Sequence, residues 1–422
     1  MATFSSENQS VSLLHFFYFM NVEKQLGRIE VIDVLRGFTL LGIILVHMTE
    51  QYYAGQAPEQ YANFASKGLA DNIVSGFIGI FVQGKFYMIF SFLFGLSFYL
   101  QLAKSDGSIG FVTRFFWRLL ILFGIGFIHH LHYRGDILTI YATLGIGLLL
   151  TYRLPDKYLL VIALLLVLNV PSLLTRLKDV IWASSNTGNP FMTNDQNSLL
   201  TYYNTLKSGA YFEILKANLA EFSSKTDFQI ASGRVYITMG LFLLGLYAGR
   251  KNIFEDIESK KSFFKKILKG SSWTLLGCVL FSAAFFGGAQ ALDIKLSDSL
   301  QWMVGGEVYD IFNAAFAIIY TTGVLLLFQK EKWKPTLMHF YAVGRMGLTT
   351  YLVQTIFGAL IFFSIGFGLL GEIGSAIAFV IAISLFIVQI QFSKFWLARF
   401  QYGIFEWLWR RLTYFKIQPL RR

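Results

Sequence analysis

The chain has 422 residues, of which 55% are hydrophobic and only 14% are charged, and its formal net charge is +11. Soluble domains carry roughly a quarter charged residues, so this composition excludes an ordinary soluble domain and indicates a multi-pass membrane protein. In a membrane protein the positions of Lys and Arg matter more than their excess, so the charge does not indicate nucleic-acid binding. The single cysteine, Cys278, lies in an apolar run, which predicts a buried thiol and no intramolecular disulfide.

Residues 1–30 are predicted to form a cytoplasmic N-terminal extension. Residues 11–19 are apolar but too short to span a membrane, and no preceding basic residue or small-residue cleavage site indicates a signal peptide. Met20 resembles a second start, so we expect residues 1–19 to be a dispensable extension or a misassigned start.

Hydrophobic runs predict a single all-α transmembrane domain over residues 31–392. The stretch 72–103 is too long for one upright span, which predicts a short interfacial helix and a break near Gly84. The ten predicted spans lie at about 34–53, 85–103, 112–131, 136–152, 157–174, 234–250, 267–287, 309–328, 346–366 and 372–392.

Two polar regions complete the predicted organisation. The segment 175–233 is predicted to lie outside the membrane, with a loop at 184–190 and an amphipathic helix at 199–222. Residues 393–422 form an aromatic and basic tail, predicted to lie at the cytoplasmic interface.

The distribution of basic residues predicts that both termini are cytoplasmic. With that orientation, internal connections carry 23 of the 36 Lys and Arg residues, and external connections carry 9, six of them in the long segment after the fifth span. This asymmetry follows the positive-inside rule and agrees with an even number of spans.

The first span carries a stripe of polar residues, Asp33, Arg36, His47 and Glu50, with Gly37 directly after the arginine. Arg36 and His47 are 11 residues apart, close to three helical turns, so they share a face about 16 Å long. Such groups are costly in hydrocarbon and are expected to face a protein interior or a wet cavity. Under the predicted orientation, Arg36 lies near the cytoplasm and His47 near the outside.

Each member of this stripe has a simpler interpretation. Asp33 and Arg36 fit an ion pair at a helix entrance, and Arg36 also fits a side chain that reaches the lipid headgroups. Gly37 permits close approach of another backbone or a ligand. His47 fits an interfacial histidine bonded to a carbonyl, or a general base that Glu50 orients.

Further candidate residues occur in later spans. Arg118 and His129 are again 11 residues apart, and His129 with His132 resembles two metal ligands without a third, so we expect no metal. Asp136 has the position of a helix N-cap. Lys85, after Gly84, and Arg345, at the start of the ninth span, are candidate cations for an acid or an anionic group.

Five motifs in this order resemble the YeiB-like family, a domain of unknown function numbered 418. They are Asp33-Val-Leu-Arg36-Gly37 with Gly42-Ile-Ile-Leu, Phe90-Ser-Phe-Leu-Phe-Gly95, Gly135-Asp-Ile-Leu138 with Tyr141-Ala142, Gly344-Arg-Met-Gly-Leu-Thr349-Thr-Tyr351, and Glu406-Trp-Leu-Trp-Arg410 with Leu412-Thr-Tyr414. That family is similar to the transmembrane acyltransferase superfamily, which includes the acyltransferase-3 proteins and the heparan glucosaminide acetyltransferases.

The resemblance implies acyl transfer from cytosolic acyl-CoA to a small-molecule, glycan or lipid acceptor across a bacterial cytoplasmic membrane. His47 occupies the place of the catalytic histidine in acyltransferase-3 proteins, where YeiB-like proteins commonly carry Asn. The implied catalytic set is His47, Glu50, Lys85 and His129, and the implied CoA-binding set is Asp33, Arg36, Gly37, Arg118 and Arg345. The alternative is a transporter or flippase for a small metabolite or a lipid-linked group, in which the same charges line a substrate path.

Overall fold

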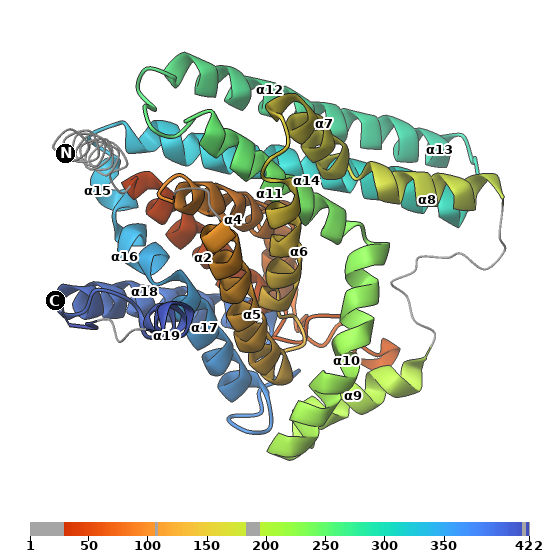
Figure 1. Ribbon diagram of the computed structural model, residues 1–422. Coiled ribbons are helices and arrows are strands. Elements are labelled where there is room, and N and C mark those ends of the chain that lie inside the picture. Colours follow the sequence, from red (N-terminus) through yellow and green to blue (C-terminus); the bar gives the residue numbers. More distant parts are fainter. Residues whose placement is uncertain (1–28, 106–108, 183–194, 416–418, 422) are drawn as a thin grey trace, which may run out of the picture.

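The computed structural model consists of helices joined by turns and loops in the residues that it describes, which are 29–105, 109–182, 195–415 and 419–421 (Figure 1). Within these residues, β pairing is limited to one antiparallel bridge between Phe400 and Arg421. The predicted all-α polytopic fold is therefore confirmed. The predictions for residues 1–19 and for the loop at 184–190 lie outside the described residues.

The helices follow the chain in a simple order. They are α2 (Glu30–Thr49), the 3₁₀ turn η1 (Glu59–Tyr61), α3 (Leu69–Phe81), α4 (Phe86–Leu102), α5 (Ile109–His132), α6 (Leu138–Thr151), α7 (Asp156–Val167), α8 (Val170–Ile181), α9 (Gln196–Ser208), α10 (Tyr211–Ala231), α11 (Arg234–Arg250), α12 (Lys261–Ser282), the π-helical turn η2 (Ala283–Gly287), α13 (Gly288–Ala291), α14 (Asp298–Phe328), α15 (Lys334–Leu337), α16 (His339–Arg345), α17 (Gly347–Phe362), α18 (Ser375–Arg399) and α19 (Ile404–Tyr414).

Among the described residues, six helical segments are long and apolar enough to cross a membrane, and three bent pairs raise the number to nine. The bent pairs are α7 with α8, α10 with α11, and Lys334–Arg345 with α17, with angles of 44°, 68° and 81°. The short apolar helix α6 is the tenth segment that overlaps a predicted span. Length and composition thus support six to nine spans, and the count of ten and the cytoplasmic termini stay predictions.

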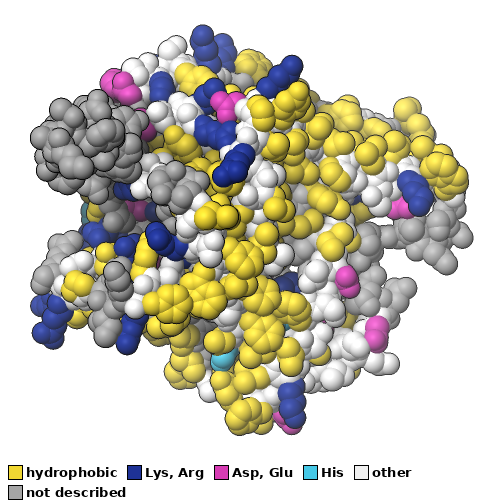
Figure 2. All heavy atoms as spheres, viewed as in Figure 1, with side chains coloured by type: hydrophobic (Ala, Val, Ile, Leu, Met, Phe, Trp, Pro, Cys, Tyr) yellow, Lys and Arg dark blue, Asp and Glu magenta, His cyan; other side chains and the backbone are white. Residues whose placement is uncertain are grey.

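The first span, α2, lies at the centre of the bundle, where it packs against α4, α16, α17 and α18. In the apolar part of α2, 67% of the residues are buried inside the protein, whereas in the peripheral segment Lys261–Ala291 only 6% are buried. Figure 2 shows hydrophobic side chains over much of the visible surface, as expected for helices that face lipid. The polar stripe of α2 is therefore enclosed by protein.

Two glycines let α2 and α16 touch backbone to backbone. A Cβ atom on Gly37 would lie 2.0 Å from the carbonyl oxygen of Phe340, and one on Gly344 would lie 1.8 Å from that of Asp33. The close approach expected at Gly37 is thus made by the backbone of α16. This contact brings the start of α2 beside Arg345, the last residue of α16.

The predicted break near Gly84 is present, between α3 and α4, and Gly84 has a left-handed φ of +83°. The segment after the fifth predicted span differs from expectation. Two helices, α9 and α10, replace the single helix expected at 199–222, because the chain turns at Gly209. The second of them continues to Ala231 and bends into α11 at Gly233, which has a φ of +76°.

The carboxyl-terminal region returns to the bundle. Helix α18 extends to Arg399, beyond the predicted span, and α19 then packs along α5 and α17. The indole of Trp409 donates to the carbonyl of Arg118 (3.0 Å), and the indole of Trp117 donates to that of Leu412 (3.0 Å). The tail is therefore part of the packed structure.

Gly37→Ala should lower the free energy of unfolding by about 1–3 kcal/mol, because the added methyl group must displace the backbone of α16. Thermal unfolding of the purified protein measures this change. Gly124→Ala in α5 is the matched control, since nothing lies within 4 Å of a Cβ atom at that position. Equal melting temperatures for the two variants would contradict the close helix contact.

Single cysteines in a Cys278→Ala background test the predicted orientation. An impermeant thiol reagent should label Ser208→Cys, at the end of α9, in intact cells, because that side chain is exposed and the segment 175–233 is predicted to lie outside. Ser259→Cys, before α12, should be labelled only after the cells are permeabilised. Labelling of Ser259→Cys in intact cells would reverse the topology.

Candidate functional site

A cavity of about 1180 Å³ lies in the bundle beside α2. Residues of α2, α3, α4, α5, α6, α9, α10, α11, α16, α17, α18 and α19 line it, together with the turn before α6. Arg36 and His47 both line this cavity, as expected for two residues on one face of α2.

Three arginines line the cavity on the side of the α2–α16 contact and α19: Arg36, Arg118 and Arg345. Arg36 donates to Asp33 (2.7 Å) and also to the hydroxyl of Ser97 on α4. These partners direct Arg36 into the protein, where its side chain stays 26% exposed, rather than toward lipid headgroups. Asp33 orients Arg36 and does not itself line the cavity.

The other two arginines are held by the returning tail. The guanidinium of Arg118 lies 4.2 Å from the ring centroid of Trp409, and its Nε is buried without a hydrogen-bond partner. Arg345 donates to the carbonyl of Gln401 (3.0 Å). Two sequence-distant segments thus complete the cluster of cations that begins at Arg36.

Glu406 lines this side of the cavity. Its carboxylate accepts from the backbone N–H groups of Leu348 (2.7 Å) and Thr349 (3.0 Å) and from the Thr349 hydroxyl, so it caps α17. Burial raises the pKa of Glu406, although the hydrogen bonds oppose that shift. Trp409 was expected only as part of an interfacial anchor and Glu406 only as part of a motif, since their partners are far away in sequence.

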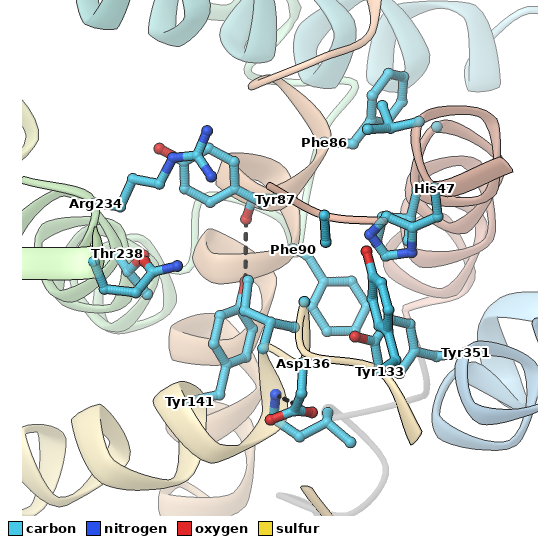
Figure 3. Close-up of a pocket in the computed structure, with 18 of the residues that line it drawn as sticks. His47, Phe86, Tyr87, Phe90, Tyr133, Asp136, Tyr141, Arg234, Thr238 and Tyr351 are labelled. Carbon is cyan, nitrogen blue, oxygen red and sulfur yellow. Dashed lines mark hydrogen bonds between the residues drawn. The ribbon is translucent and has the colours of Figure 1, made fainter. Parts of the chain in front are cut away.

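His47 lines the cavity farther along α2, in its last turn. Its ring is 5.4 Å from that of Tyr52, 5.1 Å from that of Tyr133 and 6.3 Å from that of Tyr351. Figure 3 shows the rings of His47, Tyr133 and Tyr351 grouped on one side of the cavity. The Nδ1 atom of His47 is buried and makes no hydrogen bond to a described residue, which leaves it available to a ligand.

Glu50 also lines the cavity, but its described hydrogen bond is to Gln83 (2.8 Å) and not to His47. This bond ties the end of α2 to the turn between α3 and α4.

His129 is placed behind the cavity wall. Its Nδ1 bonds to Asp136 (2.8 Å) and its Nε2 to the hydroxyl of Thr355 (2.8 Å). Asp136 lines the cavity and also accepts from the backbone N–H groups of Leu138 (3.0 Å) and Thr139 (3.0 Å), so it serves as the expected N-cap of α6. The ammonium group of Lys225 lies 3.6 Å from the second carboxylate oxygen of Asp136.

Lys85 lies outside the cavity. It is fully buried, and its Nζ donates to the carbonyls of Gly79 (3.1 Å) and Gln83 (2.8 Å). The ring of Phe312 lies 5.2 Å from this ammonium group. Lys85 therefore holds the break between α3 and α4 together, and Gly37 likewise contacts backbone rather than cavity.

Several cavity residues had no sequence signal of a site. They include Tyr133, Arg234, Thr238, Lys225 and Gln83. Tyr351 and Asp136 stood in quoted motifs without an assigned chemical role. Within the described ranges, no three His, Cys, Asp or Glu side chains come together as a metal site.

Comparison with known proteins gives relatives over nearly the whole chain. The chain is 29% identical to "Uncharacterized protein YxaH" of Bacillus subtilis over 415 residues, covering 94% of this chain and 96% of that protein. It is 27% identical to "Uncharacterized protein YeiB" of Escherichia coli over 397 residues, covering 90% and 95%. No solved structure matches the chain.

The family model described as "Protein of unknown function (DUF418)" matches residues 248–416. This match and the two relatives confirm the resemblance expected from the five sequence motifs. The chain is a multi-pass membrane protein that is similar to the YeiB-like proteins, and its residues 248–416 match the DUF418 family model.

Proposed function

We propose that this protein is a membrane acyltransferase in the bacterial cytoplasmic membrane. It takes an acyl group from cytosolic acyl-CoA and transfers it to an acceptor that enters from the outer face. The supporting observation is a cavity that is lined by three arginines and, farther along α2, by His47. The arginine side faces the cytoplasm if the predicted orientation holds.

The dimensions of the cavity suit acyl-CoA. The 11-residue separation of Arg36 and His47 corresponds to a rise of about 16 Å, which an extended pantetheine arm can cover. Arg36, Arg118 and Arg345 bind the CoA phosphates, because planar guanidinium groups match phosphate oxygens. The thioester then lies beside the aromatic group around His47.

At the reacting end, His47 accepts a proton from the acceptor hydroxyl or amine as that group attacks the thioester carbonyl. The new acyl bond forms, the carbon–sulfur bond breaks, and the departing thiolate takes the proton from His47. Hydroxyl groups of Tyr133 and Tyr351 stabilise the oxyanion, because both side chains line the cavity and pack around the His47 ring. His129 positions Asp136 in the same wall.

The three bent helix pairs favour a second candidate, a transporter or flippase. Broken helices commonly form substrate sites at the midplane of transporters. In that case the same polar cavity carries a solute, and His47 and Glu50 bind it without any acyl transfer.

The proposal predicts that Arg36 and His47 variants separate binding from chemistry. Arg36→Lys should weaken binding of labelled acetyl-CoA about tenfold, because lysine keeps the charge but lacks the planar guanidinium group. Arg36→Ala should weaken it more, because the charge is lost as well. His47→Asn should leave that binding within about twofold of wild type yet abolish CoA release from acetyl-CoA in native membranes, because Asn cannot accept a proton at neutral pH.

Arg153→Ala is the matched control, because Arg153 stacks on Tyr152 and does not line the cavity. Full transfer by His47→Asn would place the base elsewhere. Wild-type acetyl-CoA affinity in a folded Arg36→Ala protein would remove the phosphate role of Arg36. No acyl transfer by wild type, with solute movement disturbed in the His47 variants, would favour the transporter.

A further inference from the structure

The wall of the cavity formed by α4 and α11 carries an arginine that the proposed reaction does not use. Arg234 begins α11, directly after the bend at Gly233, and lines the cavity. Its guanidinium lies 5.6 Å from the ring centroid of Tyr87 and 5.0 Å from that of Phe228. Stacking on these two rings fixes the direction of the guanidinium and leaves its N–H groups free to donate.

Those donors are not used by the protein. Within the described residues, no side-chain N–H of Arg234 donates to a protein oxygen, whereas Arg36, Arg134 and Arg345 each do so. Two acids attract the Arg234 charge from a distance. They are Glu50, which is bonded to Gln83, and Asp310, which is bonded to Asn169.

Thr238 lies one helical turn beyond Arg234, on the same face of α11, and is 2% exposed. Threonines in other helices here return their hydroxyl to a backbone carbonyl, as Thr143 does to Thr139 and Thr322 to Ile318. The hydroxyl of Thr238 makes no such bond to a described residue and is a further unused donor.

Figure 3 shows how these groups lie relative to the reacting end. Arg234 and Thr238 are on one side of the cavity, with Tyr87 beside the guanidinium. His47, Tyr133 and Tyr351 are on the other side, so a small molecule between the two walls can contact both.

We propose that Arg234 and Thr238 form a subsite for a phosphate group, and that the acceptor carries this phosphate. Two guanidinium N–H groups and one hydroxyl match the three oxygens of a terminal phosphate. A phosphate held there directs a hydroxyl or amine of the same molecule toward His47. The assignment to the acceptor rests on the proposed acyl transfer, but the phosphate subsite does not.

Inorganic phosphate is the probe for the experiment. Full-length protein in phosphatidylcholine nanodiscs is saturated with CoA, so that Arg36, Arg118 and Arg345 are occupied. Binding of ³²P-phosphate is then measured at equilibrium. One CoA-insensitive phosphate site is expected in wild type. Arg234→Gln should weaken it about tenfold or more, Arg234→Lys and Thr238→Val should weaken it less, and Arg153→Gln should leave it unchanged.

The outcomes separate the two proposals. Equal phosphate affinity in wild type, Arg234→Gln and Thr238→Val, or no CoA-insensitive site in wild type, overturns the subsite. If CoA does not bind to the wild type, the proposed function is overturned. The subsite is still supported in that case if phosphate binding is lost only in the Arg234 and Thr238 variants. If Arg234→Gln shows no folded transition, Arg234→Lys and Thr238→Val decide the result.

A second lipid composition identifies the source of the phosphate. A lipid headgroup that occupies the subsite competes with ³²P-phosphate. If nanodiscs with phosphatidylglycerol raise the apparent dissociation constant for ³²P-phosphate in wild type only, the subsite therefore holds a lipid headgroup. If they do not, with the site still dependent on Arg234, it holds the phosphate of a water-soluble acceptor.

Discussion

The cost of placing charged groups within an apolar helix is the constraint on which this structure depends. Helix α2 carries Asp33, Arg36 and His47, and none of them is left to face hydrocarbon. The rest of the bundle provides their surroundings: α4 supplies a hydroxyl to Arg36, and α17 supplies an aromatic ring beside His47. The backbone contact between α2 and α16 excludes lipid from the start of this stripe.

Much of this arrangement is local in origin and was therefore predictable. Hydropathy locates the apolar helices because each must be about as long as the membrane is thick. The break near Gly84 follows from a stretch too long for one span, and the structure places it where the φ angle turns positive. The shared face of Arg36 and His47 follows from helical periodicity alone.

The rest of the candidate site depends on contacts that no local pattern encodes. Lys85 follows a glycine at a predicted break and was expected to face a ligand, yet backbone carbonyls of the same turn satisfy its ammonium group. Arg234 follows a polar segment and resembles an ordinary basic residue at a helix start. Its position inside the cavity results from the 68° bend between α10 and α11, which hydropathy does not reveal.

The return of α19 has a consequence for the order of assembly. Glu406 caps α17 and Trp409 packs on Arg118, and both residues follow every membrane helix in the chain. Helices inserted during synthesis can gather around α2 before α19 exists, but the cluster of arginines is then open and the first turn of α17 is uncapped. The cavity therefore acquires its final shape only after translation has passed the membrane domain and α19 has been made.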